Sequence, residues 1–250
     1  MAEAATSITA RAAALSPLHG GGRTEAVVQR ISESIALGLL LDGEQLPSET
    51  DLSAQLGVST VTLREALSTL REQGLVETRR GRNGGSFVRV PKDPATSFLR
   101  SRLAAFSVSE LRDAGDEHAA ISGAAARLAA SRAATDNVRR LLSLATRVAD
   151  AAGVGERTRA DTRFHIEVAV ASQSERITRA EVSLQAELGS LLWIPGPRDL
   201  EPTTAADEHI AIAQAIAREE GSLAQHLAES HVGSNLDRII EARIALHTKE

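Results

Sequence analysis

The sequence has 250 residues, 42% hydrophobic and 24% charged, which suffices for one large domain or two smaller ones with a buried core. Its formal net charge of −5 excludes a polycation that coats nucleic acid by charge alone, so any nucleic-acid contact must be local. The absence of cysteine excludes disulfides, thiolate zinc sites and a cysteine nucleophile. Only 2% of residues are aromatic, so aliphatic side chains must build the core, and this composition favours helices.

Residues 1–22 are rich in Ala, Ser and Thr and end in three glycines, which predicts a disordered N-terminal arm. The arm lacks the charged start and apolar centre of a signal peptide. The sequence also lacks the ~18 consecutive apolar residues of a membrane span, and we expect a cytoplasmic protein that does not engage membranes.

Residues 23–91 show the pattern of three helices and a hairpin. An apolar stripe from Val27 to Leu39 predicts a first helix over 24–40. Ser48 with Asp51 resembles a capping box and Gly57 a helix stop, which predicts a short second helix, and a third is expected over 60–73. Alternating residues over 75–79 and 86–90 flank a basic, glycine-rich loop and predict two strands. This order is typical of a winged helix–turn–helix.

Beyond a linker at 92–98, the alternating pattern disappears. The sequence over 99–250 predicts about six helices, near 108–132, 135–152, 156–171, 174–193, 203–220 and 222–247. We therefore expect a mainly α protein, in which the winged domain precedes an all-α antiparallel helical bundle.

The N-terminal motifs resemble those of the GntR family of bacterial transcription regulators. The resemblance lies in Leu46-Pro47-Ser48-Glu49, Leu56-Gly57-Val58-Ser59, Arg64-Glu65-Ala66-Leu67 and Gly74-Leu75-Val76. It implies a head that binds double-stranded DNA, in which Arg64 aligns with a DNA-contacting arginine of the family. Residues 58–90 carry six Arg and three Glu, a local charge of +3. The DNA-contacting residues that we expect are Thr60, Thr62, Arg64, Arg80, Arg82 and Gly84.

One such head offers few phosphate contacts, so useful specificity requires two heads on a two-fold axis. We therefore expect a homodimer that binds an inverted-repeat operator.

Asp161 and His165 are four residues apart, so on a helix their side chains lie one turn apart on the same face. By themselves they fit an ordinary helix pair better than a cation site. His209 and His231 lie on later predicted helices, which a bundle can bring close to the first pair. Oxygen and imidazole ligands suit zinc, nickel, manganese or iron, and we expect one divalent ion per chain, with zinc preferred.

The second half resembles the ligand-binding (FCD) domain of the FadR subgroup of that family, through Asp161-x-x-Phe164-His165, Glu208-His209 and His231. The resemblance implies that Asp161, His165, His209 and His231 coordinate a divalent metal ion. It also implies a small organic acid as effector. At positions where the family often has an effector-binding Arg and a Glu, this chain has His118 and Ser122. We expect both to line the effector site, although His118 fits a weaker donor, a metal neighbour or a structural residue equally well.

These features predict a DNA-binding transcriptional regulator, a repressor that responds to a small carboxylate, and not an enzyme. A purely structural metal site is one alternative. A metal-dependent hydrolase is another, but it requires a general base beside the ion, and Glu208 points about 100° away from its neighbour His209 on a helix.

Overall fold

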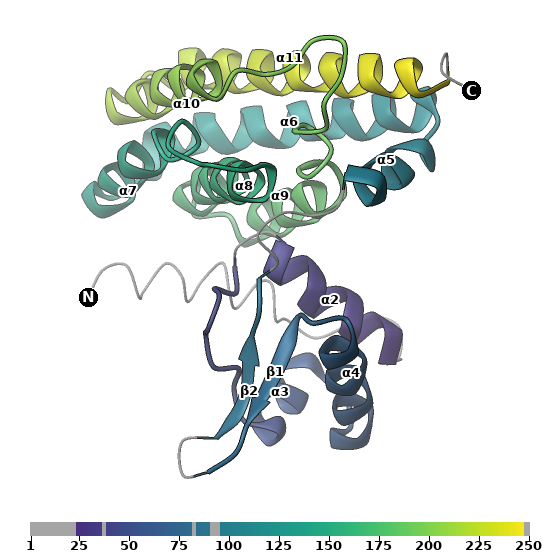
Figure 1. Cartoon of the computed structure of the whole chain (residues 1–250). Helices are drawn as coiled ribbons and strands as arrows, with labels where there is room; N and C mark the ends of the chain where they lie inside the picture. The colour runs from purple at the N-terminus through teal and green to yellow at the C-terminus, as the bar shows by residue number, and fades with distance from the viewer. Residues whose placement is uncertain (1–23, 37–38, 82–83, 91–95, 248–250) are drawn as a thin grey trace. The chain divides into compact units, whose positions relative to one another are not determined.

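The computed structural model describes residues 24–36, 39–81, 84–90 and 96–247 (Figure 1). Backbone contacts divide these residues into two compact units, here called the N-terminal unit (24–90) and the C-terminal unit (96–247). The arm expected at 1–22 lies outside the described residues, as do residues 92–95 of the expected linker. Each unit is described by itself.

Three helices and a two-stranded hairpin form the N-terminal unit. The helices are α2 (Thr24–Ala36), α3 (Glu49–Leu56) and α4 (Thr60–Glu72). The Ser48 hydroxyl accepts a hydrogen bond from the backbone N–H of Asp51 and so caps α3. Gly57, at φ 69°, ends α3 in the left-handed conformation expected of a helix stop. The second and third helices are thus confirmed, with bounds within a residue or two of those expected.

The hairpin follows α4. Strands β1 (Val76–Arg79) and β2 (Gly85–Val88) pair antiparallel, with Val76 opposite Val88. A single bridge between Gln45 and Phe87 adds the segment before α3 to this small sheet. The core of the unit combines one face of each helix with the inward residues of the hairpin: Val27, Ile31, Ile35, Leu40, Leu46, Leu52, Leu56, Leu63, Ala66, Leu67, Leu70, Val76 and Val88.

The first helix is shorter than the expected span of 24–40. Helix α2 ends at Ala36, and Leu39 and Leu40 lie in a bend. The backbone N–H groups of both leucines donate to the Ser34 carbonyl, at 2.9 and 3.1 Å, so the chain folds back across the helix end. Both leucines remain buried, so the bend places them in the core just as a further helical turn would have done.

The C-terminal unit is helical throughout, as expected. Its helices are α5 (Thr96–Ala104), α6 (Val108–Arg132), α7 (Thr135–Ala145), α8 (Val154–Ala171), α9 (Glu175–Leu188), α10 (Pro202–Ala217) and α11 (Gly221–His247). Helix α5 begins inside the span expected to be linker. Helices α7 and α9 end before the expected residues 152 and 193, and the chain continues from each in turns.

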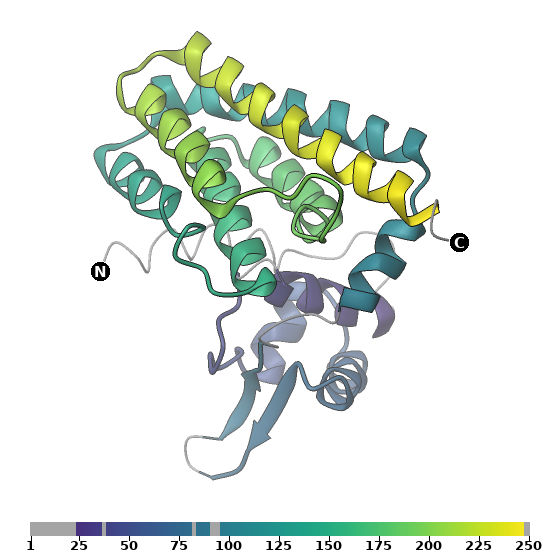
Figure 2. The same cartoon turned by 45° about the horizontal axis from the view of Figure 1, so that its top comes forward.

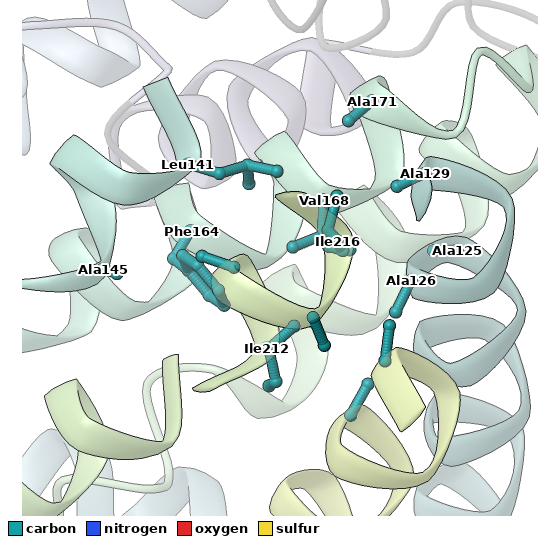
Figure 3. Close-up of a cluster of buried hydrophobic side chains, with 14 of the residues drawn as sticks. Ala125, Ala126, Ala129, Leu141, Ala145, Phe164, Val168, Ala171, Ile212 and Ile216 are labelled. Atoms are coloured by element: carbon teal, nitrogen blue, oxygen red, sulfur yellow. The ribbon is translucent and has the colours of Figure 1, made fainter. Parts of the chain in front are cut away.

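Helices α6 and α11 lie side by side and antiparallel along the unit (Figures 1 and 2). Their approach is so close that a methyl group on Gly115 of α6 would overlap the Leu236 side chain of α11. One cluster of the core joins α6, α7, α8, α10 and α11 through Leu141, Phe164, Val168, Ile212, Ile216 and several alanines (Figure 3). The small alanines let the backbones pack closely, which offsets the shortage of aromatic residues.

None of the described helices combines the length and apolar character needed to cross a membrane.

Candidate metal centre and nucleic-acid interface

The four expected metal ligands converge inside the C-terminal unit. Helix α8 provides Asp161 and His165, α10 provides His209, and α11 provides His231. All four side chains are buried, and each offers one ligand atom that lies within 4.8 Å of the other three. Asp161 and His165 share a helix face because four residues separate them, and the antiparallel packing of the bundle brings the two other helices to that face.

The spacing of these atoms fits a small divalent ion. His165 Nε2 lies 3.2 Å from His231 Nε2, and His209 Nε2 lies 3.5 Å from Asp161 Oδ1. Ligands bound at about 2.0–2.1 Å in a tetrahedral or octahedral arrangement are separated by roughly 2.8–3.4 Å between neighbours. Small side-chain movements would therefore bring the four atoms to neighbouring positions of either arrangement.

Two of the four residues carry buried polar atoms without a hydrogen-bond partner. These atoms are Oδ1 of Asp161 and both ring nitrogens of His209. The His209 ring stacks on Phe164, with 4.0 Å between ring centroids and 16° between planes, so packing fixes its orientation. Burying an unsatisfied polar atom costs about 1–3 kcal/mol, and a cation between these atoms would remove that cost. The donor set therefore fits a metal ion.

Glu208 and Asn235 surround the His231 ring. The ring Nδ1 donates to Glu208 Oε2 at 2.5 Å, which leaves the lone pair on Nε2 facing the other ligands. Asn235 Nδ2 lies 3.0 Å from the same Nε2, and the Asn235 amide is oriented by a hydrogen bond from Arg238 to its oxygen. A carboxylate on the far nitrogen is the usual way in which a metal-binding histidine is oriented and made more basic.

Burial has opposite effects on the acidic and basic members of the site. It raises the pKa of Asp161 to about 6 and lowers the pKa of His165 to about 3. Burial also holds the pKa of His209 well below its ordinary value. The imidazoles of His165 and His209 are consequently neutral near pH 7, and the neutral imidazole is the form that binds metal ions.

The two residues expected at the effector site, His118 and Ser122 on α6, both contact Glu181 of α9. His118 Nε2 lies 3.0 Å from Glu181 Oε1, and the Ser122 hydroxyl donates to Glu181 Oε2 at 2.9 Å. Gln185 Nε2 also donates to Glu181 Oε1 at 3.0 Å. Burial favours a lower pKa for His118, but the Glu181 carboxylate outweighs it and holds that pKa above its usual value. The pair is therefore a buried ion pair.

A cavity of about 30 Å³ lies against Asp161 and His165 of the proposed ligands and against His118 of the expected effector residues. Gln185 and Asn235 add to its polar walls, and apolar residues, among them Leu188 of α9 and Leu236 of α11, line much of the remainder. One water molecule needs about 10–15 Å³ on this measure, so the cavity has room for a few small atoms. Its volume restricts any ligand in this conformation to a very small molecule.

The expected DNA-contacting residues of the third helix lie at or near the surface of the N-terminal unit. Thr60 is exposed in the first turn of α4, and the Thr62 hydroxyl lies 2.9 Å from the Ser59 hydroxyl. Arg64 is 66% exposed and donates to Glu49 at 2.6 Å. An exposed ion pair is worth at most about 1 kcal/mol, so Arg64 can exchange Glu49 for a phosphate or a base at little cost.

The hairpin loop carries the other expected contacts. Arg80 is exposed, and the Gly84 N–H donates to the Gly81 carbonyl at 2.9 Å, which closes the loop. Arg82 lies outside the described residues. Two further basic residues of the hairpin, Arg79 and Arg89, both donate to Glu77, so part of the positive charge is already paired.

Sequence reasoning missed Glu181, Gln185 and Asn235, and it considered Glu208 as part of a family motif and as a possible catalytic base, not as a partner of His231. The position of Glu181 and Gln185 offered a signal. They share the inward stripe of α9 with Leu184 and Leu188, and polar residues at core positions of a helix are uncommon unless they have partners.

Comparison with known proteins identifies two families along the chain. Residues 23–88 match the family described as bacterial regulatory proteins, gntR family. Residues 110–234 match the family described as the FCD domain. Together the matched ranges include most of both units.

Individual relatives show the same similarity. RmpR of Mycobacterium gastri, whose name describes it as an HTH-type transcriptional regulator, is 45% identical over 226 residues, which cover 90% of this chain and 82% of RmpR. The Glc operon transcriptional activator of Escherichia coli K12 is 38% identical over 107 residues, 43% of this chain and 41% of the activator. The solved structure of E. coli McbR/YncC shares the fold, with a TM-score of 0.50 and 15% identity, and the match covers 86% of this chain and 96% of that one.

Proposed function

This chain belongs to the GntR family of bacterial regulatory proteins and carries an FCD domain, and from this premise we propose that a divalent metal ion in its C-terminal unit controls its binding to an operator. The chain is a DNA-binding transcriptional regulator and not an enzyme. The metal ion, the effector and the dimer are the proposed parts.

The proposal depends above all on the four convergent ligands. Asp161, His165, His209 and His231 are buried together, and Asp161 and His209 have polar atoms that no protein group satisfies. Three imidazoles and one carboxylate suit zinc best, with nickel, manganese or iron as alternatives. One ion per chain is expected.

A bound divalent ion would supply open coordination positions for a carboxylate oxygen. Protein residues would orient the ligands and form the walls around the bound acid. Glu208 keeps the lone pair of His231 Nε2 directed inward, and Asn235 and Gln185 offer amide groups along the cavity wall. Leu188 of α9 and Leu236 of α11 make part of the remaining wall apolar. Such a site favours a small organic acid as effector.

We further propose that the chain acts as a homodimer on an inverted-repeat operator, as a repressor in the cytoplasm. Two heads double the phosphate contacts of Arg64 and Arg80, which one head cannot supply in sufficient number. An effector that binds more tightly to a dimer whose heads do not match the operator would weaken DNA binding by that difference in affinity.

The test measures metal content and DNA binding in the same preparations. Protein purified without added metal, together with Asp161→Ala and His209→Ala variants, is analysed by inductively coupled plasma mass spectrometry. We expect about one ion per chain in the wild type and a loss of the ion in both variants. Small carboxylates are then titrated into a gel-shift assay, where we expect release of DNA from the metal-loaded wild type only.

A purely structural role of the metal gives a different result. In that case metal removal would lower the melting temperature, while no carboxylate would change DNA binding in the loaded or the stripped protein. A wild type that is free of metal and cannot be loaded would contradict the metal site itself.

A further inference from the structure

Val61 is an apolar side chain on the outer surface of α4. The other large apolar residues of this helix, Leu63, Leu67 and Leu70, are fully buried, whereas Val61 is 62% exposed. Exposed single valines are common on protein surfaces, so exposure alone says little. What distinguishes Val61 is its place on the helix.

Val61 points away from the core of the N-terminal unit. With 100° of rotation per residue, the buried side of α4, centred between Leu63 and Leu70, lies about 170° from Val61. The residue is also in the first turn of the helix, which is the end that reaches base edges when a helix of this type enters the major groove. Val61 therefore occupies the outermost point of the part of α4 that approaches DNA.

The neighbours of Val61 suit a nucleic-acid surface and give the valine no role in folding. Thr60 is exposed on one side, and the exposed Arg64 follows one turn later. The first turn of α4 carries no acidic residue that would repel phosphates. Thr60, Val61 and Thr62 form a run of three β-branched residues, which disfavours a helix relative to alanine or glutamate. Neither packing nor helix propensity explains a valine at this position.

We propose that Val61 contacts the C5-methyl group of a thymine in the major groove and so makes the regulator specific for that base. The thymine methyl is the apolar group that the four base pairs display in this groove, and an apolar side chain is its natural partner. Thr60, Thr62 and Arg64 around it provide hydrogen bonds to other groups. The proposal depends on the DNA-binding function of the family and is independent of the metal site.

The experiment removes the methyl group from the DNA and the side chain from the protein in turn. The full-length wild type selects its preferred duplex from a random pool. The same duplex is then synthesised as a series, in each member of which a different thymine is replaced by deoxyuridine. Uracil pairs like thymine and lacks only the methyl group. Kd values for the thymine duplex and for its deoxyuridine versions are measured by fluorescence anisotropy. The proteins compared are the wild type, Val61→Ala and the control Leu142→Ala, which changes a partly exposed leucine of α7.

We expect one thymine per half-site at which uracil weakens wild-type binding about fourfold, the value of one buried methyl-sized group, or about fifteenfold when both half-sites are changed. Val61→Ala should bind the thymine and uracil duplexes equally, and Leu142→Ala should behave like the wild type. Circular dichroism should show that Val61→Ala melts no lower than the wild type, because the side chain is exposed.

Three results would overturn the proposal. The first is a selected duplex in which no thymine is sensitive to uracil. The second is a Val61→Ala variant that retains the full thymine preference. The third is a change in dimerisation, measured by analytical ultracentrifugation, without a change in the thymine preference, which would assign Val61 to a protein contact instead. Failure of the wild type to select any duplex would contradict DNA binding itself, so the two failures are distinct.

Discussion

Asp161→Asn should have opposite effects on stability in the absence and presence of metal. Without metal, the wild-type carboxylate is buried with Oδ1 unsatisfied, at a cost of about 1–3 kcal/mol. An amide at this place carries no charge, and its N–H can donate to the neutral His209 Nε2, which lies 3.5 Å from Oδ1 in the wild type. The stripped variant should therefore be more stable than the stripped wild type.

The size of each effect follows from general relations. A gain of about 1 kcal/mol raises the melting temperature of a unit of this size by roughly 2–4 °C. Zinc at 100 times its Kd stabilises the wild type by about 2.7 kcal/mol, or roughly 5–11 °C. Because an amide replaces a charged ligand, Asp161→Asn should gain much less from zinc, and the order of the two melting temperatures should reverse.

Differential scanning calorimetry with a chelator and with added zinc measures both states. His226→Ala is the matched control, because His226 is exposed on the same helix as His231 and should leave the zinc response unchanged. An Asp161→Asn variant that melts below the wild type under both conditions, or that gains as much from zinc, would show that Asp161 does not face a metal ion.

Three further predictions concern the DNA-binding surface and the buried ion pair. Arg64→Ala should weaken binding of the selected duplex by about 1–3 kcal/mol, five- to 150-fold, and an unchanged Kd in a gel-shift assay would contradict its role. Gly84→Ala places a methyl 2.5 Å from the Arg79 carbonyl, so it should distort the hairpin loop and reduce DNA affinity more than zinc affinity, as anisotropy and metal titration would show. His118→Ala leaves the Glu181 charge buried and should lower the free energy of unfolding by about 3 kcal/mol. Adding Glu181→Gln should recover much of this loss in urea denaturation, and purely additive losses would refute the ion pair.

The N-terminal unit could be predicted almost completely from local signals. Ser48 and Gly57 mark the ends of α3 through hydrogen bonding and backbone conformation that depend on few neighbours. The end of α2 could not be found in this way. Leu39 is buried whether the chain continues as a helix or bends, so the apolar periodicity is the same in both cases.

The candidate site could also be predicted only in part from the sequence. Asp161 and His165 share a helix face because of their spacing, and a helical bundle can bring His209 and His231 near them, but assigning all four to one ion required the family resemblance. The inward position of Glu181 on its helix offered a signal, but its partner could not be predicted, because His118 is 63 residues away on another helix. Contacts of this kind depend on how the helices pack.

The close packing of α6 and α11 at Gly115 also affects the polar cavity. A single methyl group there would collide with the Leu236 side chain, so a glycine at this position lets α6 and α11 pack closely. Gly115 and Leu236 both line the polar cavity, together with His118 of α6 and Asn235 of α11. A larger residue at Gly115 would therefore push Leu236 aside and change the cavity wall beside His118, although the glycine itself has no side chain there. The shape of the polar cavity thus depends on a glycine that contributes no side chain of its own.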